Sequence, residues 1–225
     1  STWVLSNHDV IRHASRYGFD KLPPQGVGVG PDDPQPDEPR GLQIARAASA
    51  FMLGLPGSAY LFQGEELGLP EHTTLEGKYR QDPSFFRTNG ERVGRDGCRV
   101  PLPWEAEGGA SFGFNSTGES WLPAPASYKK YSRNLQEGTE GSTLELYKNL
   151  IAMRKKHQLG SGSFRFAPEH SQENSLAYIN NQILVISNLG SEPVSLPAGE
   201  IVSSTQAGLV SEGSLEQNQT VWIKL

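Results

Sequence analysis

The chain has 225 residues, of which 36% are hydrophobic and 20% are charged, and its formal net charge is -5 at pH 7. This length suffices for one large domain or two small ones. The negative charge and the lack of a dense lysine and arginine run argue against a nucleic-acid or membrane-surface partner. No apolar run in the sequence reaches the roughly 18 residues that a membrane span needs.

Cys98 is the single cysteine of the chain, so no intrachain disulfide can form, and we interpret it as a small buried apolar residue. One unpaired cysteine fits a reducing compartment, and we therefore expect a cytoplasmic protein. No spacing of metal ligands is visible, so we expect neither a metal nor a cofactor. The chain begins with Ser1 at the start of an apparent strand, with no leader before it, and we expect a piece of a longer protein.

The first feature in chain order is a short apolar run, residues 3–5, that ends in Asn7-His8-Asp9. The run predicts a buried strand, and a core would not tolerate three unpaired polar groups directly after it. The carboxyl ends of barrel strands are where (β/α)8 enzymes carry catalytic groups. An imidazole beside a carboxylate suits contact with sugar hydroxyls and a developing positive charge. The alternative is that Asn7 and Asp9 cap a turn and His8 is an ordinary polar residue.

A helix and a second strand are predicted next. Residues 12–19 read as a polar loop or short helix, and the proline, glycine and aspartate of residues 20–40 predict an exposed excursion. Residues 42–53 have helical period with one narrow polar stripe, which predicts a helix packed on most sides. A second apolar run, 59–62, again ends in polar residues, 63–66. Strand, helix and strand in this order are typical of a parallel sheet.

Residues 70–140 are long and irregular, with aromatic, glycine and proline punctuation, and we interpret them as the rim of a site. Ser142 and Glu145 form a capping-box pattern that predicts the start of a helix. Gly160 is expected to be its C-cap.

Five short strands are expected after this helix, with a hairpin turn at Asn180-Asn181. The expected strands are residues 175–179, 183–189, 194–196, 200–204 and 220–223. Their spacing predicts a small antiparallel β-sandwich. We place the boundary near residue 160, which gives two domains, 1–160 and 161–225.

Two further clusters carry polar side chains. Glu65 and Glu66 directly follow the second apolar run and could act as acids or bases, or simply cap the turn or pair with arginines. Residues 94–104 hold two arginines four positions apart, an aspartate between them and a tryptophan nearby. Guanidinium forks hydrogen-bond hydroxyls in fixed geometry and indole faces stack on sugar rings, so this segment suits a sugar.

Taken in order, residues 7–18, 54–68, 94–104 and the Trp121-Leu-Pro segment resemble the α-amylase family of glycoside hydrolases. Within that family the chain looks like the bacterial α-glucosidase and oligo-1,6-glucosidase branch, of the actinobacterial kind, over essentially its whole length.

The resemblance implies a fold that is α/β plus all-β: the C-terminal part of a (β/α)8 TIM barrel, with its last two strands and helices, followed by a small antiparallel β-sandwich. Residues 3–6 would be the seventh barrel strand and 59–62 the eighth.

The resemblance also assigns roles to site residues. His8 and Asp9 match the family's transition-state stabilisers: Asp9 would hold hydroxyls of the non-reducing glucose and favour the oxocarbenium ion, and His8 would bond a neighbouring hydroxyl. Arg95 matches the arginine that reaches the same sugar, and Arg12 matches an arginine near the mouth of the site.

Weaker matches place Asp96, Arg99 and Trp104 at the rim, where Asp96 and Arg99 are expected to bind substrate. The implied function is that of a retaining α-glucosidase, which releases glucose from the non-reducing end of maltose, isomaltose or malto-oligosaccharides. Retaining cleavage needs two carboxylates roughly 5 Å apart. In this family both come from the fourth and fifth barrel strands, which would precede Ser1.

We therefore expect the chain alone to be inactive, with the α-glucoside substrate and the missing N-terminal part of the barrel as its partners, since a whole barrel takes about 250 residues. Three alternatives stay open. A transglycosylase or isomerase, such as sucrose isomerase or trehalose synthase, uses the same scaffold. A non-catalytic relative, such as a transporter heavy chain, is disfavoured because His8, Asp9 and Arg95 are all retained. A bare carbohydrate-binding module leaves the strand-helix-strand half unexplained.

Overall fold

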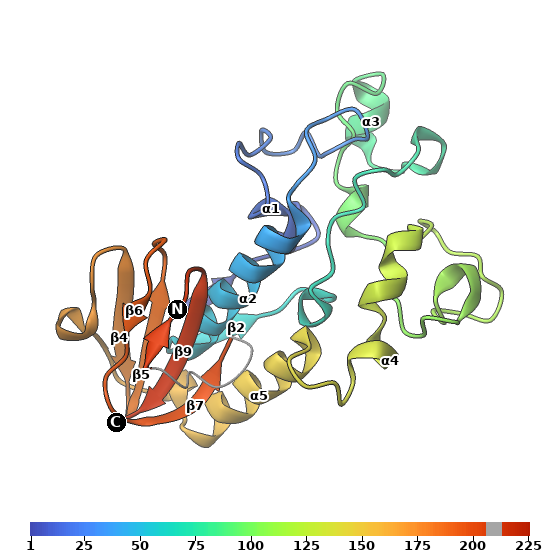
Figure 1. Ribbon diagram of the computed structural model, residues 1–225. Helices are drawn as coiled ribbons and strands as arrows, with labels where there is room; N and C mark the ends of the chain where they lie inside the picture. Colours follow the sequence, from blue (N-terminus) through green and yellow to red (C-terminus); the bar gives the residue numbers. More distant parts are fainter. Residues whose placement is uncertain (206–212) are drawn as a thin grey trace. The chain divides into compact units, whose positions relative to one another are not determined.

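The structure is a computed structural model that describes residues 1–205 and 213–225. Its helices are α1 (His13–Arg16), α2 (Glu38–Gly54), α3 (Pro83–Arg87), α4 (Arg133–Gln136) and α5 (Thr143–Lys156), joined by several short 3-10 helices (Figure 1). Its strands are β1 (Thr2–Val4), β2 (Ser58–Tyr60), β3 (Phe164–Phe166), β4 (Ser175–Asn180), β5 (Ile183–Asn188), β6 (Val194–Ser195), β7 (Glu200–Ser204), β8 (Ser214–Leu215) and β9 (Gln219–Lys224). Within the described ranges, every helix is too short or too polar to cross a membrane.

The chain forms two compact units, and each is described by itself. Unit 1 consists of Ser1–Val4, Gln43–Tyr60 and Glu145–Leu225, and unit 2 consists of Leu5–Leu42 and Leu61–Leu144. The predicted domain boundary near residue 160 stays a prediction.

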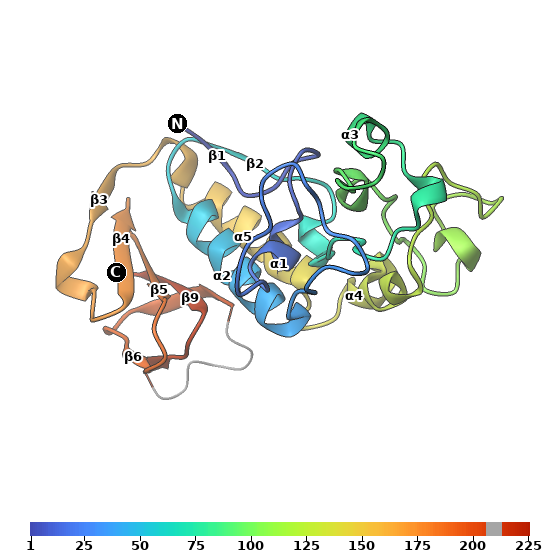
Figure 2. The same ribbon diagram turned by 90° about the horizontal axis from the view of Figure 1, so that it is seen from above.

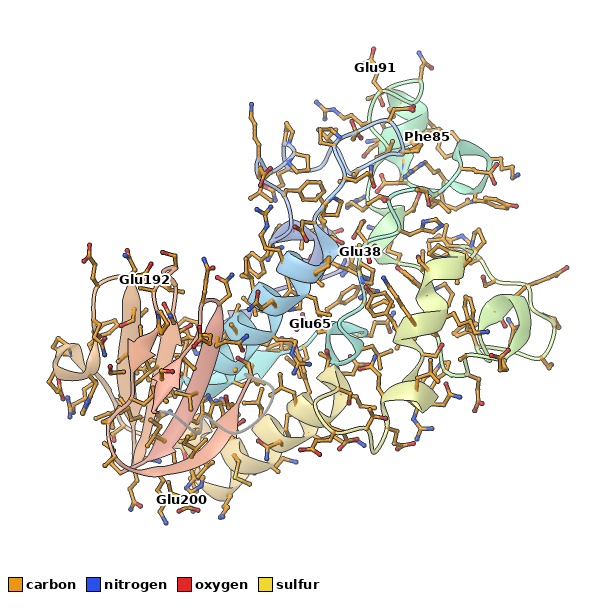
Figure 3. All side chains as sticks on the ribbon, viewed as in Figure 1. Glu38, Glu65, Phe85, Glu91, Glu192 and Glu200 are labelled. Atoms are coloured by element: carbon orange, nitrogen blue, oxygen red, sulfur yellow. The ribbon has the colours of Figure 1, made fainter. Side chains whose placement is uncertain are left out.

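Unit 1 contains the five-stranded antiparallel sheet β3-β4-β5-β9-β7 and the separate antiparallel pair β6-β8. All six residues of the central strand β5 are buried, because both faces of the sheet are covered. One face, with Leu184 and Ile186 of β5, packs against Val194 of β6 and Leu215 of β8. The antiparallel strands predicted for this part of the chain are therefore observed, and the separate β-sandwich domain stays a prediction. Figure 3 labels Glu192 and Glu200 at opposite ends of these strands.

The other face of the sheet is held to the unit 1 part of α2 by two aromatic side chains. The indole nitrogen of Trp222 in β9 donates to the carbonyl of Ala50 at 3.0 Å, and the Tyr178 hydroxyl in β4 donates to the carbonyl of Phe51 at 2.5 Å. Both aromatic side chains are fully buried. Helix α2 runs alongside the sheet in Figure 1. The helix expected at residues 42–53 is packed on most sides, as its apolar surface predicted.

Helix α5 packs on the same part of α2. The hydroxyl of Tyr147 donates to the buried Ser49 hydroxyl at 2.6 Å. Near the end of α5, the Arg154 guanidinium donates to the carbonyls of Leu53, Leu55 and Gly57, which lie at and just beyond the C-terminus of α2. A cation on the last carbonyls of a helix is favourable because the helix dipole is negative there.

Strands β1 and β2 pair in parallel, with Trp3 opposite Ala59, and run side by side in Figure 2. The parallel arrangement predicted by the strand-helix-strand order is thus observed. The prediction that both strands are buried is wrong for this chain: Val4 is 47% exposed and Tyr60 is 63% exposed. In the described part of the chain these two strands pair only with each other, so their outer edges are unpaired, and Trp3 and Ala59 on the other face are half-buried.

Three local predictions in unit 1 need correction. The hairpin loop is Asn181 and Gln182, not Asn180-Asn181, because Asn180 still pairs with Ile183 and Asn181 takes the left-handed conformation. Gly160 does not cap α5: the left-handed residue after the helix is Gln158. The strands β3 and β8 were not predicted from the sequence. Every residue of β3 is exposed and β8 has two residues, so neither has a pattern to detect.

Unit 2 is mostly irregular, as predicted for residues 70–140. It has its own core of buried aliphatic and aromatic side chains: Leu67, Leu69, Leu75, Val100, Phe112, Leu122, Tyr128 and Tyr131. At its centre the Tyr128 hydroxyl donates to the carbonyl of Pro70 at 2.8 Å. Figure 3 labels Phe85 and Glu91 on the α3 region of this unit.

Candidate active site

The polar run after β1 forms a tight turn that leads into α1. The side-chain oxygen of Asn7 accepts the backbone N–H of Asp9 at 2.8 Å, so Asn7 does cap the turn. The Ser6 hydroxyl is buried, accepts the N–H of His13 at 2.9 Å and lies 3.0 Å from its Nδ1. Burial, with the charges of Arg16 and Arg12, lowers the pKa of His13 to about 3. These bonds fix the ends of the turn and leave its tip free.

His8 and Asp9 occupy the exposed tip of this turn. The His8 side chain is 69% exposed and the Asp9 side chain 49%, and His8 Nε2 lies 3.4 Å from Asp9 Oδ2. Two side chains that are half-exposed yet adjacent can meet a ligand and each other. The alternative in which Asp9 caps the turn is not what the structure shows, because the Asp9 carboxylate binds arginines.

Arg95 and Arg99 reach the same carboxylate from a different part of unit 2. Arg95 Nη1 donates to Asp9 Oδ1 at 2.7 Å, and Arg99 Nη2 donates to the same oxygen at 3.2 Å. Arg99 Nε also donates to the backbone carbonyl of His8 at 2.9 Å. The structure therefore brings together four of the residues singled out from the sequence.

A second carboxylate, Asp82, lies behind the arginines and was missed by the sequence analysis. Its side chain has no exposed area, and its Oδ2 accepts Arg95 Nε at 2.6 Å and the Arg95 backbone N–H at 3.0 Å. Arg99 Nη1 lies 3.9 Å from the same oxygen. We call Asp9, Arg95, Asp82 and Arg99 the ion-pair ring. Asp82 precedes a proline at the start of α3, so from sequence it reads only as a helix cap.

A cavity of about 230 Å³ opens beside Asp9 and Arg95. Its remaining lining comes from the residues after Asp9, from the proline-rich loop and from two glycine-rich segments: Val10, Ile11, Arg16, Leu22, Pro23, Pro24, Gln25, Gly26, Gly28, Glu71 and Gly94. The lining is largely apolar apart from the carboxylates and guanidinium groups, which is the usual make-up of a small-ligand site.

Glu71 is a buried carboxyl in the wall of this cavity, and it too was missed. Its Oε2 accepts the backbone N–H of Arg12 at 2.9 Å, while its own N–H donates to the Ser15 hydroxyl at 2.8 Å. Burial raises the pKa of Glu71 to about 7, although the Arg12 N–H and the charges of Arg12, Arg80 and Arg99 oppose the rise. A neutral and a charged form of Glu71 are therefore both accessible near neutral pH.

Arg12 does not lie at the mouth of a site, contrary to the sequence-based expectation. It is 1% exposed, and its Nη1 and Nη2 donate to the backbone carbonyls of Gln63 at 2.7 Å and Cys98 at 2.8 Å. Its guanidinium also lies over the ring of Phe62, 4.8 Å from the centroid. Through these bonds Arg12 connects the start of α1 to the segments around Gln63 and Cys98. A buried guanidinium with these partners cannot also face a substrate.

Asp96 is also not at the rim. Its side chain is buried, and its Oδ2 accepts the backbone N–H groups of Gln81 at 2.7 Å and Asp82 at 2.9 Å. It holds the start of the α3 segment. Trp104 is 45% exposed, and its place beside a bound sugar stays a prediction.

Glu65 and Glu66 accept hydrogen bonds from backbone N–H groups of their own turn. This agrees with the interpretation that they cap the turn. Glu65 Oε1 accepts the N–H of Phe62 at 3.1 Å, and Glu66 Oε2 accepts the N–H of Gly64 at 2.8 Å. Cys98 is buried, and burial raises the pKa of its thiol to about 12, so it behaves as an inert core residue. Across the described residues, no three histidine, cysteine, aspartate or glutamate side chains gather where a metal ion could bind.

The arrangement suits a neutral polyhydroxylated ligand. Asp9 Oδ1 is held by two guanidinium groups, while Oδ2 faces the imidazole of His8 and is partly open. Carboxylate, imidazole and guanidinium groups together offer both acceptors and donors to hydroxyls. The two carboxylates and two guanidinium groups of the ring balance in charge, so the site does not favour a strongly charged ligand.

Comparison with known proteins agrees with this chemistry. Residues 1–162 match the family model described as "Alpha amylase, catalytic domain". A "Probable alpha-glucosidase" of Rhizobium meliloti (strain 1021) is 30% identical over 217 residues, which are 93% of this chain and 35% of that protein. An "Oligo-1,6-glucosidase" of Parageobacillus thermoglucosidasius is 24% identical over 95% of this chain and 38% of that protein.

Solved structures of the same kind superpose on the chain. An alpha-glucosyl transfer enzyme, XgtA, is 30% identical with a TM-score of 0.71, covering 99% of this chain and 39% of that one. The trehalulose synthase MutB is 26% identical with a TM-score of 0.71, covering 100% of this chain and 43% of that one. The chain thus spans little more than a third of the length of the curated relatives above. The match to the catalytic-domain model over most of its residues shows that the chain belongs to the alpha-amylase family.

Proposed function

We propose that this chain supplies the transition-state-stabilising part of a retaining α-glucosidase active site, in a protein whose nucleophile and acid/base carboxylates lie upstream of Ser1. The single observation that carries the proposal is that Arg95 binds Asp9 beside one cavity, with the imidazole of His8 3.4 Å from the Asp9 carboxylate. Relatives named alpha-glucosidase and oligo-1,6-glucosidase support it. In this proposal the chain is the C-terminal part of a (β/α)8 barrel, with β1 and β2 as its last two strands.

In the proposed mechanism Asp9 accepts hydrogen bonds from hydroxyls of the glucose unit at the non-reducing end. Oδ1 is held by Arg95 and Arg99, so Oδ2 is the oxygen available to the sugar. As the glycosidic bond breaks, positive charge develops on the sugar ring, and the fixed carboxylate stabilises it more than the neutral ground state. His8, on the open side of Asp9, would bond a neighbouring hydroxyl.

The test uses the longest polypeptide that the reading frame around this sequence encodes, assayed with p-nitrophenyl α-glucoside. We expect turnover, and we expect Asp9→Asn to lower kcat/KM about 1000-fold, in the range found when an enzyme loses one transition-state-stabilising group. Asp20→Asn is the matched control, because Asp20 lies on the surface with a 90% exposed side chain. Equal activity of the Asp9→Asn and Asp20→Asn variants would contradict the proposal.

The chain of residues 1–225 alone is expected to show no turnover, because no nucleophile is assigned within it. Turnover by residues 1–225 that survives Glu65→Gln and Glu66→Gln would show that the catalytic carboxylates have been misplaced.

A transglycosylase or isomerase is the second candidate, because an alpha-glucosyl transfer enzyme and a trehalulose synthase are among the structural neighbours at 30% and 26% identity. The two functions differ in whether water or a second sugar attacks the glycosyl intermediate. Product analysis separates them: a hydrolase releases glucose from maltose and sucrose, whereas a transferase or isomerase yields new disaccharides.

The proposed location is the cytoplasm. It rests on Cys98 being the single cysteine of these 225 residues, a cysteine usage that fits a reducing compartment. Fractionation of the source cells, with immunodetection of the protein, tests it.

A further inference from the structure

Two aspartates lock the segment 81–84 to the segment 94–96 by reciprocal bonds. The carboxylate of Asp96 accepts the backbone N–H of Asp82 at 2.9 Å, and the carboxylate of Asp82 accepts the backbone N–H of Arg95 at 3.0 Å. Gly94 makes the close approach possible: its φ is +77°, and a Cβ there would lie 2.7 Å from the Asp82 Cβ. The position of Asp82 is therefore fixed from two sides before any ligand arrives.

The two oxygens of Asp82 have separate partners. Oδ1 accepts the N–H of Ser84 at 2.9 Å at the start of α3, while Oδ2 accepts Arg95 Nε at 2.6 Å. Arg95 Nη2 lies 3.4 Å from Oδ1. Burial opposes the charge on Asp82, but the bonds from Arg95 and Ser84 outweigh it and hold the pKa of Asp82 below its ordinary value.

We propose that Asp82 is a positioning residue for sugar binding: it holds the Arg95 guanidinium so that only Nη1 points to Asp9 and the bound glucose. The proposal rests on the proposed function of this site.

The geometry of Arg95 carries this inference. Its Nε and Nη2 face Asp82, and Nη1 faces Asp9, so the guanidinium plane is fixed along one edge. An arginine with a single hydrogen bond to its side chain would keep most of its rotamer freedom. Hydrogen bonds to two edges of the planar guanidinium group remove that freedom.

Charge leads to the same conclusion. In the ion-pair ring Asp82 shares the two guanidinium groups with Asp9. Without the charge of Asp82, both arginines would have Asp9 as their only carboxylate in the ring. Arg95 and Arg99 would then both move onto the Asp9 carboxylate and compete with sugar hydroxyls for its two oxygens.

Asp82→Asn tests this role, because the amide keeps the shape of the residue and an oxygen for the Ser84 N–H, while it removes the charge and places an NH2 group where Oδ2 accepts from Arg95. In the longest polypeptide of the reading frame we expect kcat/KM for p-nitrophenyl α-glucoside to fall about 100-fold, as small misplacements of reacting groups do. Asp37→Asn is the control: Asp37 accepts the N–H of Arg40 at the start of α2 and lies outside the ring. It should change kcat/KM less than about twofold.

A double-mutant cycle distinguishes positioning from general support of the fold. Arg95→Lys keeps a positive charge beside Asp82 but loses the planar fork. If Asp82 acts through Arg95, Asp82→Asn lowers kcat/KM by less than about threefold in the Arg95→Lys background. The same loss in both backgrounds would overturn the proposal.

A crystal structure of the unliganded Asp82→Asn variant gives a result that does not depend on turnover. We expect Arg95 Nη1 to leave Asp9 Oδ1 or to change its approach, while the wild-type protein keeps the pair. An unchanged Arg95 in the variant would overturn the positioning role. Lack of α-glucoside turnover by the wild-type protein would instead overturn the proposed function, and the crystal comparison would still decide the role of Asp82.

Discussion

Arg95 Nη1 donates to Asp9 Oδ1 at 2.7 Å, although the two residues stand 86 positions apart in the chain. The same guanidinium also binds Asp82, whose side chain has no exposed area, while the Asp9 side chain is 49% exposed. One arginine thus bridges a carboxylate open to ligand and a carboxylate sealed in the interior. Removing Asp9 and removing Arg95 should therefore lower the stability of the protein by very different amounts.

Asp9→Asn should leave stability almost unchanged. Exposed ion pairs contribute little because water screens them, so we expect the free energy of unfolding to fall by less than about 1 kcal/mol. Urea unfolding at pH 7 measures this. A loss as large as that from deleting a core side chain would mean that Asp9 is structural and would count against its assignment to substrate.

Arg95→Ala should destabilise the protein by about 3 kcal/mol, because it leaves the Asp82 carboxylate buried without its main cationic partner. Arg92→Ala is the matched control, since Arg92 is exposed on the same loop. Urea unfolding of both variants provides the comparison. Equal stabilities would show that Asp82 does not depend on Arg95.

The secondary structure that could be predicted from the sequence is the part with a periodic pattern. The apolar cylinder of α2, the apolar face of α5 and the strands β4, β5, β6, β7 and β9 were all found, with ends shifted by a few residues. Strand β3 was missed because all its residues are exposed, and an edge strand with no buried face has no pattern to read. The capping role of Gly160 failed because Gln158 adopts the left-handed conformation instead.

The site was predictable only in part. The pairing of Asp9 with Arg95 followed from a family resemblance and not from any local pattern. Arg12 and Asp96 were placed at the mouth and the rim of the site because the family resemblance assigned them there. Their burial depends on partners such as Cys98, 86 positions from Arg12, that no local pattern indicates. Asp82 was missed because an aspartate before a proline is fully explained as a helix cap.

Glu71→Gln should make the protein less sensitive to alkaline pH. The pKa of Glu71 is about 7 in the folded protein and near its ordinary value of 4.5 when unfolded. The stability it contributes is therefore complete below pH 4.5 and is lost as pH rises through 7. Between pH 5 and pH 8 the wild-type protein should lose about 2 to 3 kcal/mol of stability through this group. The Glu71→Gln variant keeps an oxygen that accepts the Arg12 N–H, and it should not show this loss of stability between pH 5 and pH 8.

Urea unfolding of wild type and Glu71→Gln at pH 5 and pH 8 tests this. Glu76→Gln is the control, because the Glu76 side chain is 64% exposed and pairs with Lys78 on the surface. If the difference between wild type and Glu71→Gln is the same at both pH values, Glu71 does not titrate in this range.

His13 should make the protein sensitive to acid. Burial, with the charges of Arg16 and Arg12, lowers the pKa of His13 from 6.5 to about 3. The stability linked to this neutral imidazole is present above pH 6.5 and is lost as pH falls toward 3. Between pH 7 and pH 4 we expect a loss of about 3 kcal/mol through His13.

His13→Asn should remove this acid dependence while it lowers stability at pH 7, because the amide only partly replaces the contact with Ser6. Unfolding by urea at pH 7 and pH 4 measures both effects, with His170→Asn as a control in unit 1. If acid lowers the stability of His13→Asn as much as that of wild type, the acid sensitivity comes from other groups. His72 is one such group, because burial lowers its pKa to about 4.

Trp222 should be a main source of stability in unit 1, because its buried ring packs between the sheet and α2 and its indole nitrogen donates to the Ala50 carbonyl. Trp222→Ala should cost about 4 kcal/mol, from lost burial and the cavity left behind. Trp121→Ala, at a residue that is 60% exposed, should cost less than about 1 kcal/mol. Urea unfolding of the two variants, read by far-ultraviolet circular dichroism, compares them. Equal losses would mean that Trp222 contributes no more to the stability of the protein than an exposed tryptophan does.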